Sequence, residues 1–125
     1  MSRVELTSNL GPEAFTSWDK ITDADPSKNY SSIIDVRLYT LHSYQVHSEA
    51  GNGSVQFQIL GSNYTDPATN SASSDFQNHW SLISDHAISG GENLAYCDFW
   101  NFKYSCIRFI GSSTKSIKVF EKHNA

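Results

Sequence analysis

The sequence predicts an all-β protein: a single β-sandwich with jelly-roll character, seven or eight strands and an extended N-terminal arm. Aromatic residues are abundant, with seven Phe, six Tyr and three Trp, and aromatic side chains favour strands. From residue 33 onward, apolar and polar residues alternate over short stretches that turn residues separate. We find no convincing amphipathic helix. At 125 residues the chain has room for one compact domain.

The expected strands follow one another to residue 122. The clearest contains Val55, Phe57 and Ile59, which alternate strictly with glutamines. The turn sequence GNGS at 51–54 precedes this strand. The other strands are expected near 34–38, 44–47, 80–83, 94–99, 104–110 and 116–122.

A polar loop is expected from Gly61 to about Asn78. It is long for a connection within a compact domain, and such loops are often functional. The apolar positions that are in phase on the neighbouring strands predict the core. We expect buried side chains at Val55, Phe57, Ile59, Trp80, Ile107, Phe109 and Val119.

Residues 1–30 differ from the rest, since they carry two of the three prolines and alternate only weakly. We therefore interpret 1–30 as an extended arm and 31–125 as the sandwich domain. Apolar residues on an arm need a surface to bury against. That surface is either a partner, or the protein's own sandwich, to which the arm would supply an edge strand or lid. The arm residues nominated for partner binding are Leu10, Phe15, Trp18 and Ile21.

The formal net charge of −4 is spread along the chain without a run of like sign. No basic stripe is available to meet a phosphate backbone, so we expect no nucleic-acid partner. No stretch approaches the roughly 18 apolar residues of a membrane span, so we expect no membrane partner. The first residues lack the apolar core of a secretory signal, and no export route is visible.

Candidate reactive groups form no catalytic or metal-binding pattern. His79, Asp85 and His86 come nearest to a metal cluster. Adjacent strand residues point to opposite faces, however, and we interpret all three as solvated loop residues. The sequence contains no nucleophile elbow, no Cys–His signature and no glycine-rich phosphate loop. We therefore predict that the protein is not an enzyme and uses no cofactor and no metal.

Cys97 and Cys106 flank a candidate turn at 101–102. If this turn is the tip of a hairpin, the two cysteines lie opposite each other, where relaxed disulfide geometry is rare. Two free, buried or half-buried thiols in a reducing compartment is the favoured interpretation, and a disulfide is the alternative.

An aromatic cluster, Trp100 with Phe99 and Phe102, lies at the same turn. Exposed aromatic side chains at a loop end suit a sugar or a protein partner, so Trp100 and Phe102 are nominated as partner-binding residues. The alternative is that the cluster caps the end of the sandwich. Arg108 is expected to be structural, on the solvent face or paired with an acid across the sheet.

Several segments resemble small β-sandwich virion proteins of tailed bacteriophages. Phe57–Ser62 follows the pattern F-x-[IV]-x-[GA]-S, and Trp80–Ile83 follows W-x-x-[IVL]. Tyr104–Arg108 and Ile117–Val119 match the two closing strands of that family. The same skeleton is similar to galactose-binding-like jelly rolls, including discoidin-type modules.

The resemblance covers about residues 33–122. The loop from Ser62 to Trp80 is longer than the family pattern, and residues 1–30 match nothing in it. The family has no defined set of functional residues, so none is carried over to this chain.

The resemblance implies a structural protein of the virion, made in the host cytoplasm and placed on the capsid or tail surface. We expect a capsid decoration or cement protein. Its partners would be the major capsid protein or other virion proteins, and copies of itself. The alternative is a carbohydrate-binding module of a tail or head-fibre adhesin, with a surface glycan as its ligand.

Overall fold

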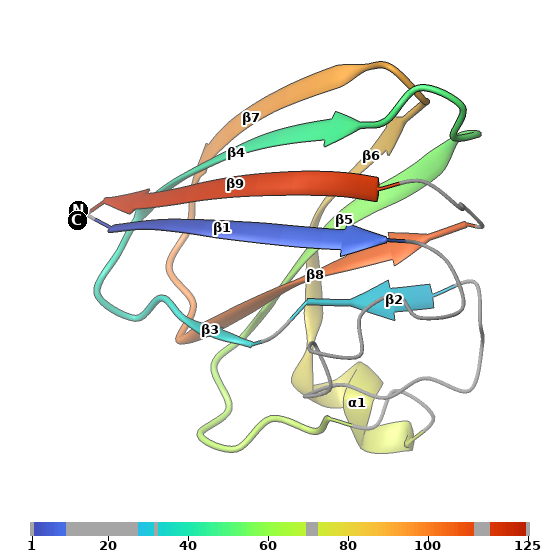
Figure 1. Cartoon of the computed structure of the whole chain (residues 1–125). Helices are drawn as coiled ribbons and strands as arrows, with labels where there is room; N and C mark the ends of the chain where they lie inside the picture. Colours follow the sequence, from blue (N-terminus) through green and yellow to red (C-terminus); the bar gives the residue numbers. More distant parts are fainter. Residues whose placement is uncertain (1, 10–27, 32, 70–72, 112–115, 125) are drawn as a thin grey trace.

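Two β-sheets pack face to face in the computed structural model, which describes residues 2–9, 28–31, 33–69, 73–111 and 116–124 (Figure 1). One short helix accompanies them in this part of the chain. The elements are β1 (Ser2–Asn9), β2 (Lys28–Tyr30), β3 (Ile34–Asp35), β4 (Leu41–Ser48), β5 (Val55–Ser62), α1 (Ser74–His79), β6 (Ser81–Ile88), β7 (Asn93–Phe99), β8 (Tyr104–Ile110) and β9 (Ser116–Asn124).

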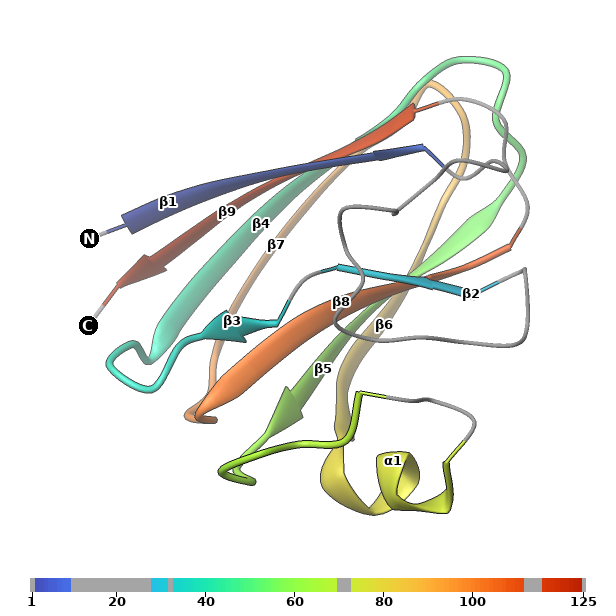
Figure 2. The same ribbon diagram turned by 60° about the horizontal axis from the view of Figure 1, so that its bottom comes forward.

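The strand order is that of a jelly roll. The four-stranded sheet has the order β1-β9-β4-β7, and the five-stranded sheet has the order β2-β8-β5-β6 with β3 also paired to β8. Because β2 and β3 pair with successive parts of β8, they act as one interrupted strand. Every pairing is antiparallel, and the chain passes repeatedly between the two layers (Figure 2). The predicted sandwich is therefore confirmed.

The main core lies between the two sheets and is built by alternate residues of their strands. Phe57 and Phe109 lie side by side on the inner face of the five-stranded sheet, with ring centroids 5.5 Å apart. Tyr44 of the opposite sheet meets the Phe57 ring edge-on at 6.2 Å. All seven residues expected to be buried are buried: Val55, Phe57, Ile59, Trp80, Ile107, Phe109 and Val119.

The helix α1 lies in the segment that was expected to be a polar loop without helix, so that expectation is wrong. The Ser73 hydroxyl caps α1 by accepting the amide of Asp75 at 3.2 Å. Only Phe76 is buried within α1, which is too little for a helical apolar period. No helix in the described ranges is long and apolar enough to cross a membrane.

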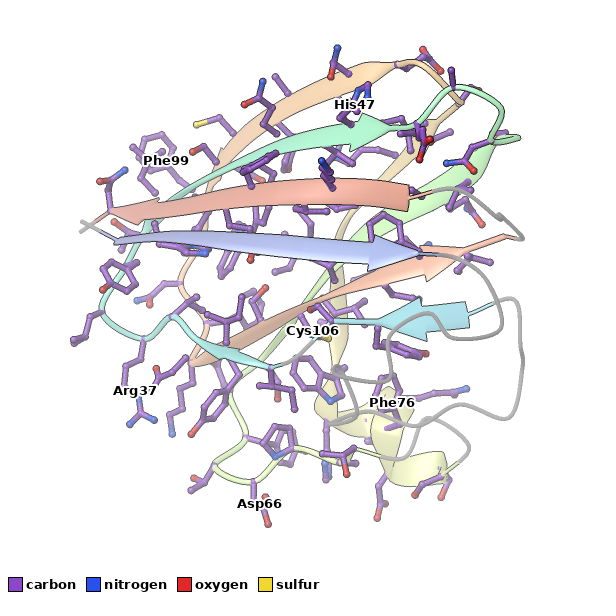
Figure 3. The ribbon with its side chains drawn as sticks, viewed as in Figure 1. Arg37, His47, Asp66, Phe76, Phe99 and Cys106 are labelled. Carbon is purple, nitrogen blue, oxygen red and sulfur yellow. The ribbon has the colours of Figure 1, made fainter. Side chains whose placement is uncertain are left out.

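A second core lies on the outer face of the five-stranded sheet, under α1. Phe76 lies between α1 and the strands (Figure 3). The Trp80 ring packs beside it, and its indole N–H donates to the carbonyl of Ala68 at 2.9 Å. The residues around Ala68, together with α1 and Trp80, therefore cover this sheet. The second core is formed by Tyr30, Leu60, Phe76, Trp80 and Cys106.

Replacing Trp80 by Phe is expected to lower the free energy of unfolding by about 1–3 kcal/mol, because the half-buried Ala68 carbonyl loses its donor. Urea denaturation measures this loss. Gln77→Ala, at an exposed position of α1, is the control and should change stability by less than about 0.5 kcal/mol. Equal losses in the two variants would contradict the proposed cover.

Parts of the segment 1–30 belong to the sandwich. Ser2–Asn9 forms the edge strand β1 beside β9, and Lys28–Tyr30 pairs with β8. For these residues the structure corresponds to the alternative in which the segment adds an edge strand to its own sandwich. The sandwich is therefore not limited to 31–125. The nominated residues Leu10, Phe15, Trp18 and Ile21 lie outside the described residues.

Candidate functional site

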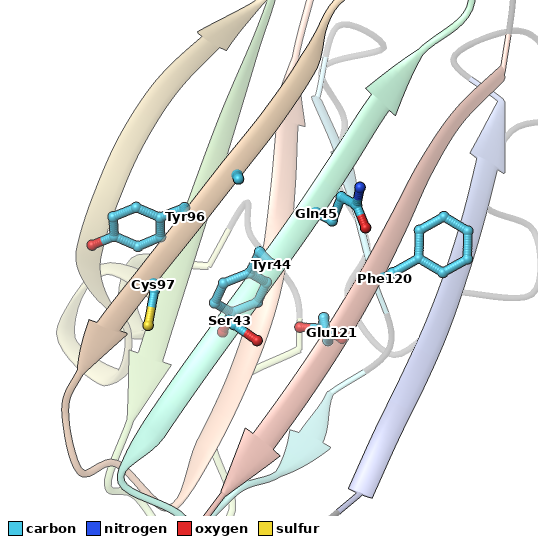
Figure 4. Close-up of a pocket in the computed structure, with 8 residues that line it drawn as sticks. Ser43, Tyr44, Gln45, Tyr96, Cys97, Phe120 and Glu121 are labelled. Carbon is cyan, nitrogen blue, oxygen red and sulfur yellow. The ribbon is translucent and has the colours of Figure 1, made fainter.

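An open groove of about 460 Å³ lies on the outer face of the four-stranded sheet, over β7, β4 and β9 (Figure 4). Strand alternation explains it, since successive residues of β4 and β7 point in turn to the core and to solvent. Small outward side chains leave the sheet uncovered between larger ones. The outward residues that line the groove are Ser43, Gln45, Ala95, Cys97 and Phe120, and Tyr44, Tyr96 and Glu121 complete the lining.

The groove presents an uncharged surface. Its outward side chains carry a hydroxyl, an amide, a thiol and an aromatic ring. Its single carboxyl, Glu121, is buried, and burial raises the pKa of Glu121 to about 8. Phe99, 73% exposed, extends the same face of β7 (Figure 3). This face suits an uncharged ligand or the apolar surface of another protein.

The three aromatic side chains at residues 99–102 differ in exposure, and two of them pack against the end of the sandwich. The Trp100 ring stacks on the buried His42 ring at 3.5 Å, and Phe102 packs beside Trp100 at 5.9 Å. Phe102 also closes over Gly61, where an added Cβ would lie 2.8 Å from the Phe102 ring. Trp100 and Phe102 are thus half-buried at the end of the sandwich, and Phe99 is the exposed member.

A buried polar cluster lies beneath one end of the groove, on the inner face of β4 and β9. His42 and His123 are 0% and 1% exposed, and their Nδ1 atoms are 2.8 Å apart. His42 Nε2 lies 3.0 Å from the Trp100 carbonyl oxygen. Glu121 Oε1 lies 3.9 Å from His123 Nε2. In the described part of the chain, Glu121 Oε2, His123 Nε2 and the Tyr44 hydroxyl have no hydrogen-bond partner.

Burial sets the protonation of this cluster. It lowers the pKa of His123 to about 4, with a further contribution from His42. It also lowers the pKa of His42, against the opposing effect of the Trp100 carbonyl. Burial raises the pKa of Glu121 to about 8 and raises that of Tyr44 strongly. The neutral form of each group is therefore favoured near neutral pH.

Sequence reasoning did not identify the buried polar cluster, although the strand phase contained the signal. His42 is in phase with Tyr44, which the alternation of β4 directs to the core. Glu121 and His123 are in phase with Val119. A titratable residue at a core position of a strand is the pattern to look for.

His79, Asp85 and His86 do not lie in a loop as expected, and among them Asp85 alone is fully exposed to solvent. Asp85 and His86 belong to β6, with Asp85 exposed and the His86 ring 4.4 Å from that of Tyr96. His79 ends α1, and its Nδ1 accepts the Ala68 amide at 2.9 Å. Within the described residues, no group of three His, Cys, Asp or Glu side chains is placed to hold a metal ion.

Cys97 and Cys106 are both free. The turn at 101–102 connects the two sheets and is not a hairpin tip, because β7 pairs with β4 whereas β8 pairs with β5. The two cysteines are therefore not cross-strand neighbours. Cys97 is exposed in the groove, whereas the pKa of the Cys106 thiol is raised by burial.

Arg108 has a structural position, but its partner is not an acid. Its Nε–H donates to Gln58 Oε1 at 2.7 Å across β5 and β8. Its guanidinium lies 5.9 Å from the centre of the Tyr30 ring. These contacts fix Arg108 beside the second core.

No protein-family model matches the chain, and the comparison with curated proteins found no match either. Several solved structures share its fold. It is similar to PirA, with a TM-score of 0.51 and 8% identity over 98% of this chain and 93% of PirA. It is similar to the PBSX exported protein XepA, with a TM-score of 0.57 and 10% identity over 96% of this chain but only 37% of XepA.

The third similar structure is the K3 cleaved adhesin domain of Lys-gingipain from Porphyromonas gingivalis W83. Its TM-score is 0.55 and its identity 11%, over 96% of this chain and 73% of that domain. All three identities are low, so these similarities establish a shared fold. The chain has the β-sandwich fold of these proteins.

Proposed function

We propose that the chain is a non-catalytic structural protein of the bacteriophage virion surface, a capsid decoration or cement protein. The observation that carries this proposal is the groove on the outer face of the four-stranded sheet, whose outward lining side chains are uncharged. Phe99 is 73% exposed there, next to a groove of about 460 Å³. Exposed apolar surface beside a concave site is typical of a protein-binding face.

The partners would be the major capsid protein, other virion proteins or copies of the chain itself. A side chain of the partner would enter the groove while Phe99 packs against the partner surface. Each contact can be weak, because repetition over a lattice supplies avidity. We retain Leu10, Phe15, Trp18 and Ile21 as additional proposed contacts.

A mass-spectrometric inventory of purified particles tests the virion location. If the protein decorates the shell, it is present in many copies per particle. Its absence from particles of a phage that encodes it would contradict the proposal.

Replacing Phe99 by Ser is expected to weaken binding to particles that lack the protein by at least about tenfold, since an exposed aromatic anchor is removed. The melting temperature should stay within about 2 °C of the wild type, because Phe99 contributes little to the core. Leu38→Ser is the matched control. Leu38 is 76% exposed but lies outside the groove lining, in the connection before β4. Equal binding by both variants and the wild type would contradict the assignment of the face.

A second candidate function is carbohydrate binding. It is favoured by the combination of Ser43, Gln45 and Phe120 in one groove. The hydroxyl and the amide can hydrogen-bond to sugar hydroxyls, and the ring offers a stacking surface. Binding to a panel of immobilised glycans, together with absence from purified particles, would favour this candidate over the first.

A further inference from the structure

The direction of the hydrogen bonds in the buried polar cluster follows from one backbone group. The Trp100 carbonyl oxygen can only accept, so His42 Nε2, 3.0 Å away, carries a proton. Burial favours neutral His42, which leaves its Nδ1 without a proton. His123 Nδ1, 2.8 Å from that atom, must then be the donor.

This assignment fixes the state of the next group. A neutral His123 that carries its proton on Nδ1 presents a bare Nε2, and that atom faces Glu121 Oε1 at 3.9 Å. An ionised carboxylate would meet a lone pair there, while its Oε2 has no hydrogen-bond partner among the described residues and the side chain is only 1% exposed. Glu121 is therefore protonated. The three side chains hold three protons and carry no net charge.

Other titratable side chains surround the cluster. The charge of Asp98 on β7 raises the pKa of His42. The Asp98 carboxylate itself accepts hydrogen bonds from the Tyr96 hydroxyl at 2.7 Å and the Phe99 amide at 2.8 Å. These two hydrogen bonds lower the pKa of Asp98, so its carboxyl stays ionised and does not take up the added protons in place of the histidines. Tyr39 approaches His123 with ring centroids 6.1 Å apart. The described groups that face the cluster are Tyr39, Tyr44, Tyr96 and Asp98, with Cys106 and Arg108 on the other side of β8.

We infer that Glu121, His123 and His42 form an uncharged cluster that holds β9 and β4 together, which we call the lock. Protonation of its histidines separates the two strands at this point, which we call its opening. Once both imidazoles are protonated, each Nδ1 carries a hydrogen toward the other, and the 2.8 Å contact becomes repulsive. Because β4 and β9 carry part of the groove lining, acidification loosens the proposed binding face. That last consequence rests on the proposed function, whereas the lock itself does not.

Nitrogen-15 NMR of the imidazole rings in the wild-type protein at pH 7 tests the lock directly. We expect His42 with its proton on Nε2 and His123 with its proton on Nδ1, and a scalar coupling across the Nδ1–H···Nδ1 bond. A proton on Nε2 of His123, or on both of its nitrogens, would overturn the inference. This measurement needs no partner, so its failure is distinct from failure of the proposed function.

Hydrogen exchange then tests the opening. The amides of β9 from Val119 to His123, corrected for intrinsic rates, should exchange about tenfold faster per pH unit between pH 6.5 and 4.5. The reason is that the opened form binds one more proton overall. His123→Asn keeps a donor near Nδ1 but cannot be protonated, and should flatten this dependence. His47→Gln, on the outer face of β4, is the control and should retain it. The same acceleration in His123→Asn as in the wild type would overturn the opening mechanism.

Discussion

Replacing Phe57 by Ala is expected to lower the free energy of unfolding by about 3–5 kcal/mol. Phe57 is 0% exposed, and its ring lies among those of Phe109, Tyr44 and His86 at 5.5, 6.2 and 6.2 Å. These residues come from four strands in both sheets. The substitution therefore leaves a cavity at the centre of the sandwich, which no single strand can fill by moving.

Urea denaturation of the Phe57→Ala variant gives the loss. The control is Gln56→Ala, one residue earlier in β5 at an exposed position, for which we expect a change within about 0.5 kcal/mol. If Phe57→Ala lost less than about 1 kcal/mol, the inner face of β5 would be wrongly assigned.

The second large effect concerns the pH dependence of stability. Burial raises the pKa of Glu121 from its ordinary value of 4.5 to about 8, so the folded form binds the extra proton. The stability linked to this proton is fully present below pH 4.5 and is lost as pH rises to about 8. The pKa of His123 is lowered from 6.5 to about 4, so its linked stability is lost as pH falls through this range. Glu121 and His123 offset each other between pH 4.5 and 6.5, and burial also lowers the pKa of His42, so the two histidines together outweigh Glu121 there and stability is maximal near pH 6.5.

Above pH 6.5 the Glu121 effect is no longer offset by the histidines. The wild type is expected to lose about 1 kcal/mol between pH 6.5 and pH 8. Glu121→Gln has the same shape, can donate to His123, and cannot ionise. It should therefore keep most of its stability over this range, as measured by denaturation at each pH. Parallel curves for the two proteins would show that Glu121 is ionised in the fold.

The sequence predicted the buried strand residues correctly where the alternation of apolar and polar side chains was strong. Val55, Phe57 and Ile59 were placed correctly because all three face the main core, whereas Gln56 and Gln58 between them lie on the other face of β5. The helix α1 was missed because its burial depends on Phe76 alone and on the sheet beneath it. That partner surface is assembled from strands distant in the chain, which local periodicity does not record.

The sheets to which β7 and β8 belong could not be predicted from the local sequence either. The sequences around Cys97 and Cys106 look like the two arms of a hairpin, yet they join different sheets. Two successive strands can pair with each other or join different sheets, and the outcome depends on which other strands lie beside each of them. For the same reason the groove could not be predicted, because its lining from β4, β7 and β9 meets only in the finished sheet.

The antiparallel pairing of β1 with β9 brings the two ends of the chain to one end of the sandwich, with Ser2 opposite His123 (Figure 1). A pulling force applied through the two ends would act across this pair and separate its hydrogen bonds one after another. A force spread over the outer face of a sheet would instead load many bonds at once. Tension is therefore better carried through the faces of this protein than through its termini.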